Sequence, residues 1–326
     1  MTAQDSATDQ TPIAVPLPES GKAPRTERAT APEGSPGGSS ATPRGGLLAA
    51  ALGVVCFSLT FPGTAWALEG FGPWTSVTLR TVTAAAAAAV LLAVLRVPVP
   101  ARRHWPGLAV AASGVVAGFP VLTTLALETS STSHAAVVVG LLPLTTAVYS
   151  SLRTGARPSP AFWAVALAGA AVVVAFALYE SGGAPTRADL YLGGALLVCA
   201  AGYAEGGRLA RELTGLEVIG WALIGSLPLA VPAAALALWA EPVHVTPHAV
   251  AGLLWVSLGS TLLGLLLWYR GLGTAGVARA GQVQLAQPLL TLVWSVLLLG
   301  ERLSPAAPPA ALAVLVVIVL VQRTKA

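Results

Sequence analysis

Apolar residues along this chain gather into ten long runs, which begin near Gly45 and are separated by short polar or Gly/Pro-rich interruptions. Each run holds about 18 to 24 residues, and about 20 consecutive apolar residues form an α-helix long enough to cross the hydrocarbon core of a bilayer. The pattern predicts an all-α membrane protein with ten transmembrane helices. We expect them near residues 46–66, 74–95, 106–127, 132–152, 160–179, 190–210, 217–240, 249–270, 277–299 and 306–322.

Residues 1–44 follow a different pattern. They are rich in Pro, Ser, Thr, Gly and Ala, carry charges of both signs and show no apolar periodicity. Such a segment cannot bury a hydrophobic core. We expect a disordered cytoplasmic tail and not a secretory signal, because the first long apolar run starts late and further spans follow it.

One stretch of the chain occurs twice, 145 positions apart. Pro143–Pro160 and Pro288–Pro305 are identical at ten of their 18 positions. Ten spans divide into five and five, and because five is odd the two copies cross the membrane in opposite directions. The sequence therefore predicts two inverted five-helix repeats, residues 45–180 and 189–323. This arrangement is typical of transporters whose substrate site lies between the halves.

Composition and charge support the membrane assignment and orient the chain. It is 55% hydrophobic and 10% charged, against roughly 25% charged residues in an ordinary soluble domain. With the N-terminus in the cytoplasm, every Lys and Arg except Arg80, Arg187 and Arg302 lies in the cytoplasmic tails or junctions. Cytoplasmic loops carry the Lys/Arg excess of membrane proteins, so we expect both termini in the cytoplasm. The net charge of +4 reflects this bias and does not indicate nucleic-acid binding.

Two motifs carry a family resemblance. One runs from Gln287-Pro288 to Leu299-Gly300-Glu301-Arg302 on span nine, and the other is Arg80 within VTLRTVTAAAAAAVLL on span two. With five-plus-five spans, the chain resembles EamA-type members of the drug/metabolite transporter superfamily over about Gly45–Gln322. The resemblance implies a secondary transporter of the cell membrane that moves amino acids, related metabolites or toxic compounds, mostly outward, by alternating access.

The first repeat departs from the family pattern. Members often carry Gly-Glu at the end of both repeats, but the first repeat here has Gly155-Ala156. Whatever this glutamate does in the family, Glu301 alone can do it in this chain. Glu301 is either part of an outer gate or one partner of a structural pair with Arg302 at the helix end, where an exposed pair contributes little to stability.

Arg80 is the clearest candidate for substrate binding. It lies seven residues into span two, about 10 Å deep at 1.5 Å per residue. A charge at that depth is costly and marks a functional candidate. Its guanidinium could hold an anionic group by two parallel hydrogen bonds. The alternative is that the side chain extends to the interface or binds backbone carbonyls.

Span nine carries a polar face that we interpret as part of the same site. At 100° per residue, its polar side chains fall within about 80° of one another. Such a stripe either faces substrate or holds helices together. Both glutamines belong only to the second copy, which favours a site over symmetrical packing. The predicted binding residues are Gln284, Gln287, Thr291, Trp294 and Tyr149, which matches Trp294 in span four, and the predicted helix breaks are Pro143 and Pro288.

Glu205 is the candidate for coupling. It lies toward the cytoplasmic end of span six among Gly202, Gly206 and Gly207, which would let a helix or ligand approach closely. A desolvated carboxyl binds a proton more readily, so a proton is the candidate coupling ion. The alternative is a local pair with Arg208, one turn away.

Other function classes have less support. The chain has no Gly-rich phosphate loop for ATP and no His/Cys/Asp/Glu cluster with metal-ligand spacing, so no cofactor or metal is expected. It also lacks a convincing nucleophile–base pair for an intramembrane enzyme. A non-transporting scaffold or channel is the remaining alternative. The expected partners are a small-molecule substrate and the lipid bilayer, and the oligomeric state is left open.

Overall fold

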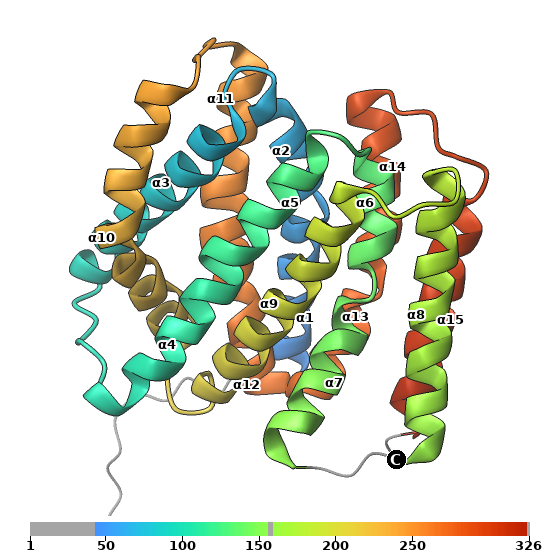
Figure 1. Cartoon of the computed structure of the whole chain (residues 1–326). Coiled ribbons are helices and arrows are strands. Elements are labelled where there is room, and N and C mark those ends of the chain that lie inside the picture. The colour runs from blue at the N-terminus through green and yellow to red at the C-terminus, as the bar shows by residue number, and fades with distance from the viewer. Residues whose placement is uncertain (1–42, 156–158, 325–326) are drawn as a thin grey trace, which may run out of the picture. The chain divides into compact units, whose positions relative to one another are not determined.

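The computed structural model describes residues 43–155 and 159–324, and these residues form helices joined by short loops (Figure 1). One isolated β-bridge, between Phe71 and Val243, is the exception to helix and loop within these ranges. By length and composition, eight of the helical stretches can cross a membrane. They are Gly45–Leu68, Pro73–Val94, Arg102–Leu127, Thr132–Thr154, Pro160–Glu180, Gly215–Ala240, Pro247–Ala275 and Arg279–Leu299. The multi-pass, all-α character predicted from the sequence is confirmed, whereas the predicted tail falls almost entirely outside the described residues.

The two other predicted spans are also helical, but they do not meet the same measure of length and hydropathy. Helix α9 (Arg187–Leu209) has 23 residues, and Asp189, Glu205 and two arginines lower its mean hydropathy. Helix α15 (Ala307–Thr324) is apolar over Ala307–Leu320, and its side chains are described only as far as Leu320. The count of ten spans therefore stays a prediction.

Several spans are broken into shorter helices. The elements besides α9 and α15 are α1 (Pro43–Ser58), α2 (Thr60–Leu68), α3 (Pro73–Val94), η1 (Arg102–His104), α4 (Trp105–Ala111), η2 (Ala112–Gly118), α5 (Phe119–Leu127), α6 (Thr132–Val139), α7 (Leu142–Thr154), α8 (Pro160–Glu180), α10 (Gly215–Ala240), α11 (Pro247–Leu254), η3 (Trp255–Gly264), α12 (Leu265–Ala275), α13 (Val277–Gln284) and α14 (Ala286–Leu299). Segments η2 and η3 are π-helices.

The irregular points recur at the spacing of the sequence repeat. The break between α6 and α7 lies at Gly140–Leu141, and the break between α13 and α14 lies 145 positions later at Leu285. Each break precedes a proline, Pro143 or Pro288, whose missing N–H cannot bond to the carbonyl of the preceding turn. The π-helical segments η2 and η3 overlap at the same spacing.

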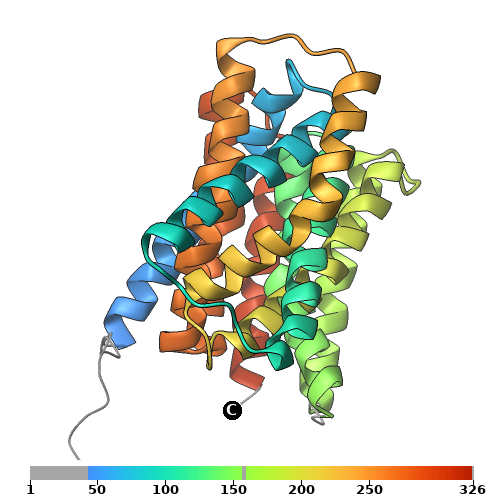
Figure 2. The same cartoon turned by 90° about the vertical axis from the view of Figure 1, so that its left-hand side faces the viewer.

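The helices pack side by side in pairs. Helix α3 runs against α10, α1 against α12, and α8 against α15; Figure 2 views the face formed by α3 and α10. In Figure 1, α1 begins and α15 ends at the lower end of the bundle, and the opposite end is the upper end. Helices α6 and α7 run downward in that view, whereas α13 and α14 run upward. Helix α9 contacts α5, α7 and η2, which places it centrally.

Candidate functional site

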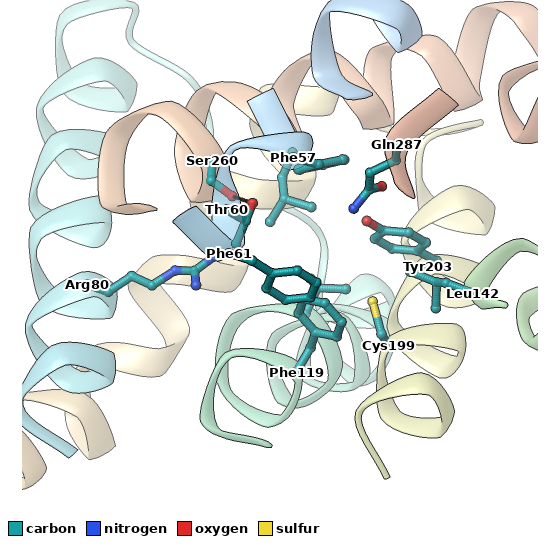
Figure 3. Close-up of a pocket in the computed structure, with 12 residues that line it drawn as sticks. Phe57, Thr60, Phe61, Arg80, Phe119, Leu142, Cys199, Tyr203, Ser260 and Gln287 are labelled. Atoms are coloured by element: carbon teal, nitrogen blue, oxygen red, sulfur yellow. Dashed lines mark hydrogen bonds between the residues drawn. The ribbon is translucent and has the colours of Figure 1, made fainter. Parts of the chain in front are cut away.

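The central cavity is lined by helices from both parts of the chain and has a volume of about 30 Å³. Four aromatic rings, those of Phe57, Phe61, Phe119 and Tyr203, line the cavity. The polar lining residues are Thr60, Arg80, Ser260 and Gln287. Figure 3 shows the rings of Phe61 and Phe119 between Arg80 on one side and Tyr203 with Gln287 on the other. The cavity is therefore an apolar chamber with a cation at one end and an amide at the other.

Arg80 is held inside the bundle. Its side chain is buried, with 5% of the residue exposed, and its Nε donates a hydrogen bond of 2.6 Å to the hydroxyl of Thr261 in η3. That hydroxyl in turn donates to the carbonyl of Val256, five residues back along the π-helix. Such depth disfavours the alternative in which the guanidinium reaches the interface. Within residues 43–155 and 159–324, no carboxylate forms an ion pair with Arg80.

A second, smaller cavity lies where the two broken helices cross. It has a volume of about 10 Å³, and Gln284, Gln287, Thr291, Pro143 and Pro288 line it together with four apolar residues. Gln287 lines both cavities, so the two spaces are neighbours. The amide nitrogen of Gln284 is buried and has no hydrogen-bond partner among the residues that the structure describes. An unpaired buried donor costs about 1–3 kcal/mol, which favours an acceptor from water or ligand at this point.

Two residues of the predicted stripe fix α14 to the break between α1 and α2. Pro62 has no N–H to donate to the carbonyl of Ser58, four residues earlier. The hydroxyl of Thr291 donates to that carbonyl at 2.9 Å, and the indole of Trp294 donates to the Ser58 hydroxyl at 3.0 Å. The stripe thus serves both alternatives, since Gln284 and Gln287 face cavities while Trp294 holds helices together. Trp294 and Tyr149 line neither cavity, and Tyr149 packs against the hydrophobic core.

Known proteins resemble the chain over nearly the whole helical region. The model of the EamA-like transporter family matches residues 44–178 and again residues 186–323. The chain belongs to the EamA-like transporter family. This EamA-like transporter is 41% identical over 275 residues to the uncharacterized transporter YdeK of Bacillus subtilis (strain 168), a match that covers 83% of this chain and 95% of YdeK. A solved crystal structure, 20% identical, matches with a TM-score of 0.62 over 88% of this chain and all of that one, which shows the same fold.

Glu205 of this EamA-like transporter lies at the lower end, away from both cavities. Its carboxylate is buried and receives a hydrogen bond of 2.9 Å from Nε of Arg208, and Nε of Arg153 lies 3.3 Å from its other oxygen. The pair with Arg208 is the alternative that helical spacing predicted. The partner Arg153 was missed, because it is far away in the sequence, at the end of α7. The three charges together connect α7 to α9.

Glu301 caps a helix of the other repeat. Its two carboxylate oxygens accept hydrogen bonds from the backbone N–H groups of Thr132 (2.9 Å) and Ser133 (3.0 Å), at the start of α6. A carboxylate there satisfies free N–H groups and interacts favourably with the helix dipole. Helix α13, the counterpart of α6, begins after Gly276, which has no side chain that could cap it. Ala156, which matches Glu301 in the first repeat, lies outside the described residues.

A second glutamate, which the sequence did not single out, makes the same kind of contact. The carboxylate of Glu241, just after α10, accepts hydrogen bonds from the backbone N–H groups of Trp74 (3.2 Å) and Thr75 (2.7 Å) in the first turn of α3. One sequence signal could have found it. Glu241-Pro242 directly follows a long apolar run, so its carboxylate lies at a helix end, where it could cap a neighbouring helix such as the one that starts at Gly72-Pro73. Glu241 and Glu301 therefore both join the end of a late helix to the start of an early one, at the upper end.

Replacing Glu301 with alanine is expected to lower the stability of the folded protein by about 1–2 kcal/mol, because two N–H groups of α6 lose their acceptor. Glutamine, which keeps one acceptor oxygen, should cost less than alanine. Thermal unfolding of the purified protein in detergent measures both. The matched control is Glu128→Ala, which removes an exposed glutamate at another helix end. Equal melting temperatures for Glu301→Ala and Glu128→Ala would contradict the capping role.

Another polar cluster joins α6 to the start of α9 at the upper end. Asp189 forms a capping box with Thr186, and its other oxygen lies 2.8 Å from Nε2 of His134. Burial raises the pKa of Asp189, but hydrogen bonds from Thr186 and His134 outweigh it and hold the pKa below its ordinary value of 3.8. The charged form is thus the one that the folded state stabilises.

The pH dependence of this cluster follows from that direction. A lowered pKa contributes stability above the pKa of the unfolded chain, and this contribution is lost as the pH falls through the folded pKa. Asp189→Asn should lower stability at pH 7 by roughly 1 kcal/mol, the value of a lost helix cap. The difference in melting temperature between the unmodified protein and Asp189→Asn should shrink below about pH 4. A difference that stays constant from pH 7 to pH 3 would contradict this assignment.

Proposed function

We propose that this membrane transporter moves a small metabolite across the cell membrane by secondary transport, most often outward. The observation that carries the proposal is the central cavity. Arg80 and Thr60 come from the first repeat, and Ser260 and Gln287 come from the second. A site built from both repeats can change its exposure when the repeats move against each other. The proposed binding residues are Arg80, Gln284, Gln287 and Thr291, which line the two cavities, and Trp294 and Tyr149, which line neither in this conformation.

We further propose that the chain has ten spans in two inverted repeats, residues 45–180 and 189–323, with both termini in the cytoplasm. The opposite directions of α6–α7 and α13–α14 support inversion, and so does the shared spacing of breaks and π-helical segments. Helix α9 is 23 residues long, or about 34 Å at 1.5 Å per residue, so it is long enough to be a span. The positions of Lys and Arg support the orientation.

Alternating access requires contacts that open in turn at the two ends. At the upper end, the proposed gate contact is Glu301 on the start of α6. At the lower end, Glu205 with Arg153 and Arg208 joins α7 to α9. Protonation of Glu205 would weaken both of its ion pairs and free α7, which is how a proton could couple to transport. An imposed pH gradient that leaves flux unchanged would contradict this role of Glu205.

The function is tested in two steps. Metabolites are first compared between cells and medium for strains that lack or overproduce the protein, and a compound that accumulates inside the lacking strain is the substrate. That compound is then offered to vesicles that contain the purified protein. Saturable flux supports a carrier, whereas unsaturable conductance supports the channel alternative. No metabolite difference and no flux would favour the scaffold and contradict the proposal.

A further inference from the structure

We propose that the central cavity takes an apolar monocarboxylate, a molecule with one negative charge, an apolar body and no ammonium group. This inference rests on the proposed function and names the substrate class of the same site. It excludes amino acids and cationic compounds as the preferred substrates. Three features of the cavity carry it, namely its charge, the distribution of its polar groups and the nature of its walls.

The first feature is the charge of the lining. Arg80 is the one charged residue among the lining residues of the two cavities, which are all described, and none of them is acidic. The buried carboxylate of Glu205 is already paired with two arginines and lines neither cavity. A buried cation without a partner is costly, and an anion that binds beside it compensates that cost. An ammonium group would find no opposite charge and would be repelled by Arg80.

The second feature is the arrangement of donors. Thr261 engages Nε of Arg80 and so fixes the guanidinium. Thr60 and Ser260 line the same cavity as Arg80, and their hydroxyls hydrogen-bond to each other at 2.7 Å (Figure 3). A carboxylate there can accept charge-assisted hydrogen bonds. At the other end, the unpaired amide nitrogen of Gln284 offers one further donor in the adjoining space. A neutral acceptor such as a hydroxyl or carbonyl oxygen suits that donor.

The third feature is the wall between these ends. Phe57, Phe61, Phe119, Val115 and Leu265 surround the space between Arg80 and Gln287. Inorganic anions gain nothing from such walls, whereas burying an apolar body contributes about 25 cal/mol per Å². The open volume of about 30 Å³ is far below the usual range of ligand pockets, about 300–1,000 Å³, so the walls must move apart to admit the ligand. The rings of Phe61 and Phe119 occupy its middle, so we expect them to turn when the ligand binds.

Three compounds with the same phenyl ring and two-carbon chain test the charge class. They are 3-phenylpropionate, phenylalanine and phenethylamine, whose net charges at pH 7 are about −1, 0 and +1. Equilibrium binding of each radiolabelled compound is measured on the full-length protein in lipid nanodiscs. We expect 3-phenylpropionate to bind at least tenfold more tightly than the other two. Equal or tighter binding of phenylalanine or phenethylamine, or no binding of 3-phenylpropionate at millimolar concentration, would overturn the proposal.

Two variants and one competitor locate the binding. Arg80→Gln should weaken binding of 3-phenylpropionate at least tenfold, and Arg187→Gln, at an exposed arginine outside the cavity, should leave it unchanged. Because the preference among the three compounds is measured on the unmodified protein, misfolding of Arg80→Gln would not remove the test. Chloride that displaces 3-phenylpropionate at equal concentration would show a site for inorganic anions and overturn the proposal.

The failure of this inference differs from the failure of the proposed function. If vesicles transport phenylalanine and not 3-phenylpropionate, the charge class is wrong and the transporter stands. If the strains show no metabolite difference and vesicles show no saturable flux of any compound, the proposed function itself is wrong. Transport of 3-phenylpropionate that depends on Arg80 supports both.

Discussion

Transport by the Arg80→Gln variant is expected to fall at least tenfold, while the protein remains in the membrane and folded. Hydrogen bonds to a charged group contribute about 1.5–3 kcal/mol, and 1.4 kcal/mol corresponds to a factor of ten in affinity. Removing a buried cation that has no ion pair should not lower stability, so the melting temperature should stay the same or rise. Flux into vesicles and thermal unfolding measure the two effects separately.

A graded control separates the charge of Arg80 from its position. Thr261→Val removes the hydroxyl that holds Nε at 2.6 Å but keeps the cation. This variant should lose part of the transport, less than Arg80→Gln, and a second expected sign is a raised KM. Transport by Arg80→Gln within twofold of the unmodified protein would remove Arg80 from the site.

The second large effect is expected at Gly114, where span three meets α9 through backbone atoms. A Cβ at Gly114 would lie 2.4 Å from the carbonyl oxygen of Val198 and 2.9 Å from Cα of Gly202. Since both neighbours are backbone atoms, α9 must shift to admit even one methyl group. Overpacking of this kind costs about 1–3 kcal/mol, so Gly114→Ala should lower the melting temperature and the yield of folded protein.

Gly193 supplies the matched control on α9. A Cβ there meets nothing within 4 Å, and alanine is favoured over glycine in a helix by about 1 kcal/mol. Gly193→Ala should therefore keep or raise stability. If Gly114→Ala is as stable as Gly193→Ala, the close approach of η2 and α9 is not what the structure describes.

Much of the fold could be predicted because the bilayer constrains it so strongly. Apolar runs located the helices, and the repeated stretch located the two broken helices through Pro143 and Pro288. The π-helical segments could not be predicted, since a shift from i+4 to i+5 hydrogen bonds leaves the apolar pattern almost unchanged. Eight stretches meet the measure for a span where ten were predicted, because charges lower the mean hydropathy of α9 and the side chains of α15 are described only as far as Leu320.

The parts of the candidate site that depend on the geometry of a single helix could be predicted from the sequence. The spacing of 100° per residue brings Gln284 and Gln287 to the same side, and the structure places both beside a cavity. The prediction failed where a contact depends on a helix that is distant in the sequence. The contact of Trp294 with Ser58 depends on the break in span one, and the partner of Glu205 on α7 depends on how helices pack. Interactions between residues far apart in sequence leave no periodic signal.

The unequal starts of α6 and α13 have a mechanical consequence. The carboxylate of Glu301 caps the start of α6, whereas α13 begins after Gly276, which has φ +84° and no side chain that could act as a cap. A helix start whose N–H groups are held by a carboxylate resists bending, whereas a start that follows a glycine bends more readily. The two helix starts therefore differ in stiffness. We expect the start of α13 to bend more than the start of α6 when the transporter changes conformation. Helix α13 also carries Gln284, so we expect the residue with the unpaired donor to move with it.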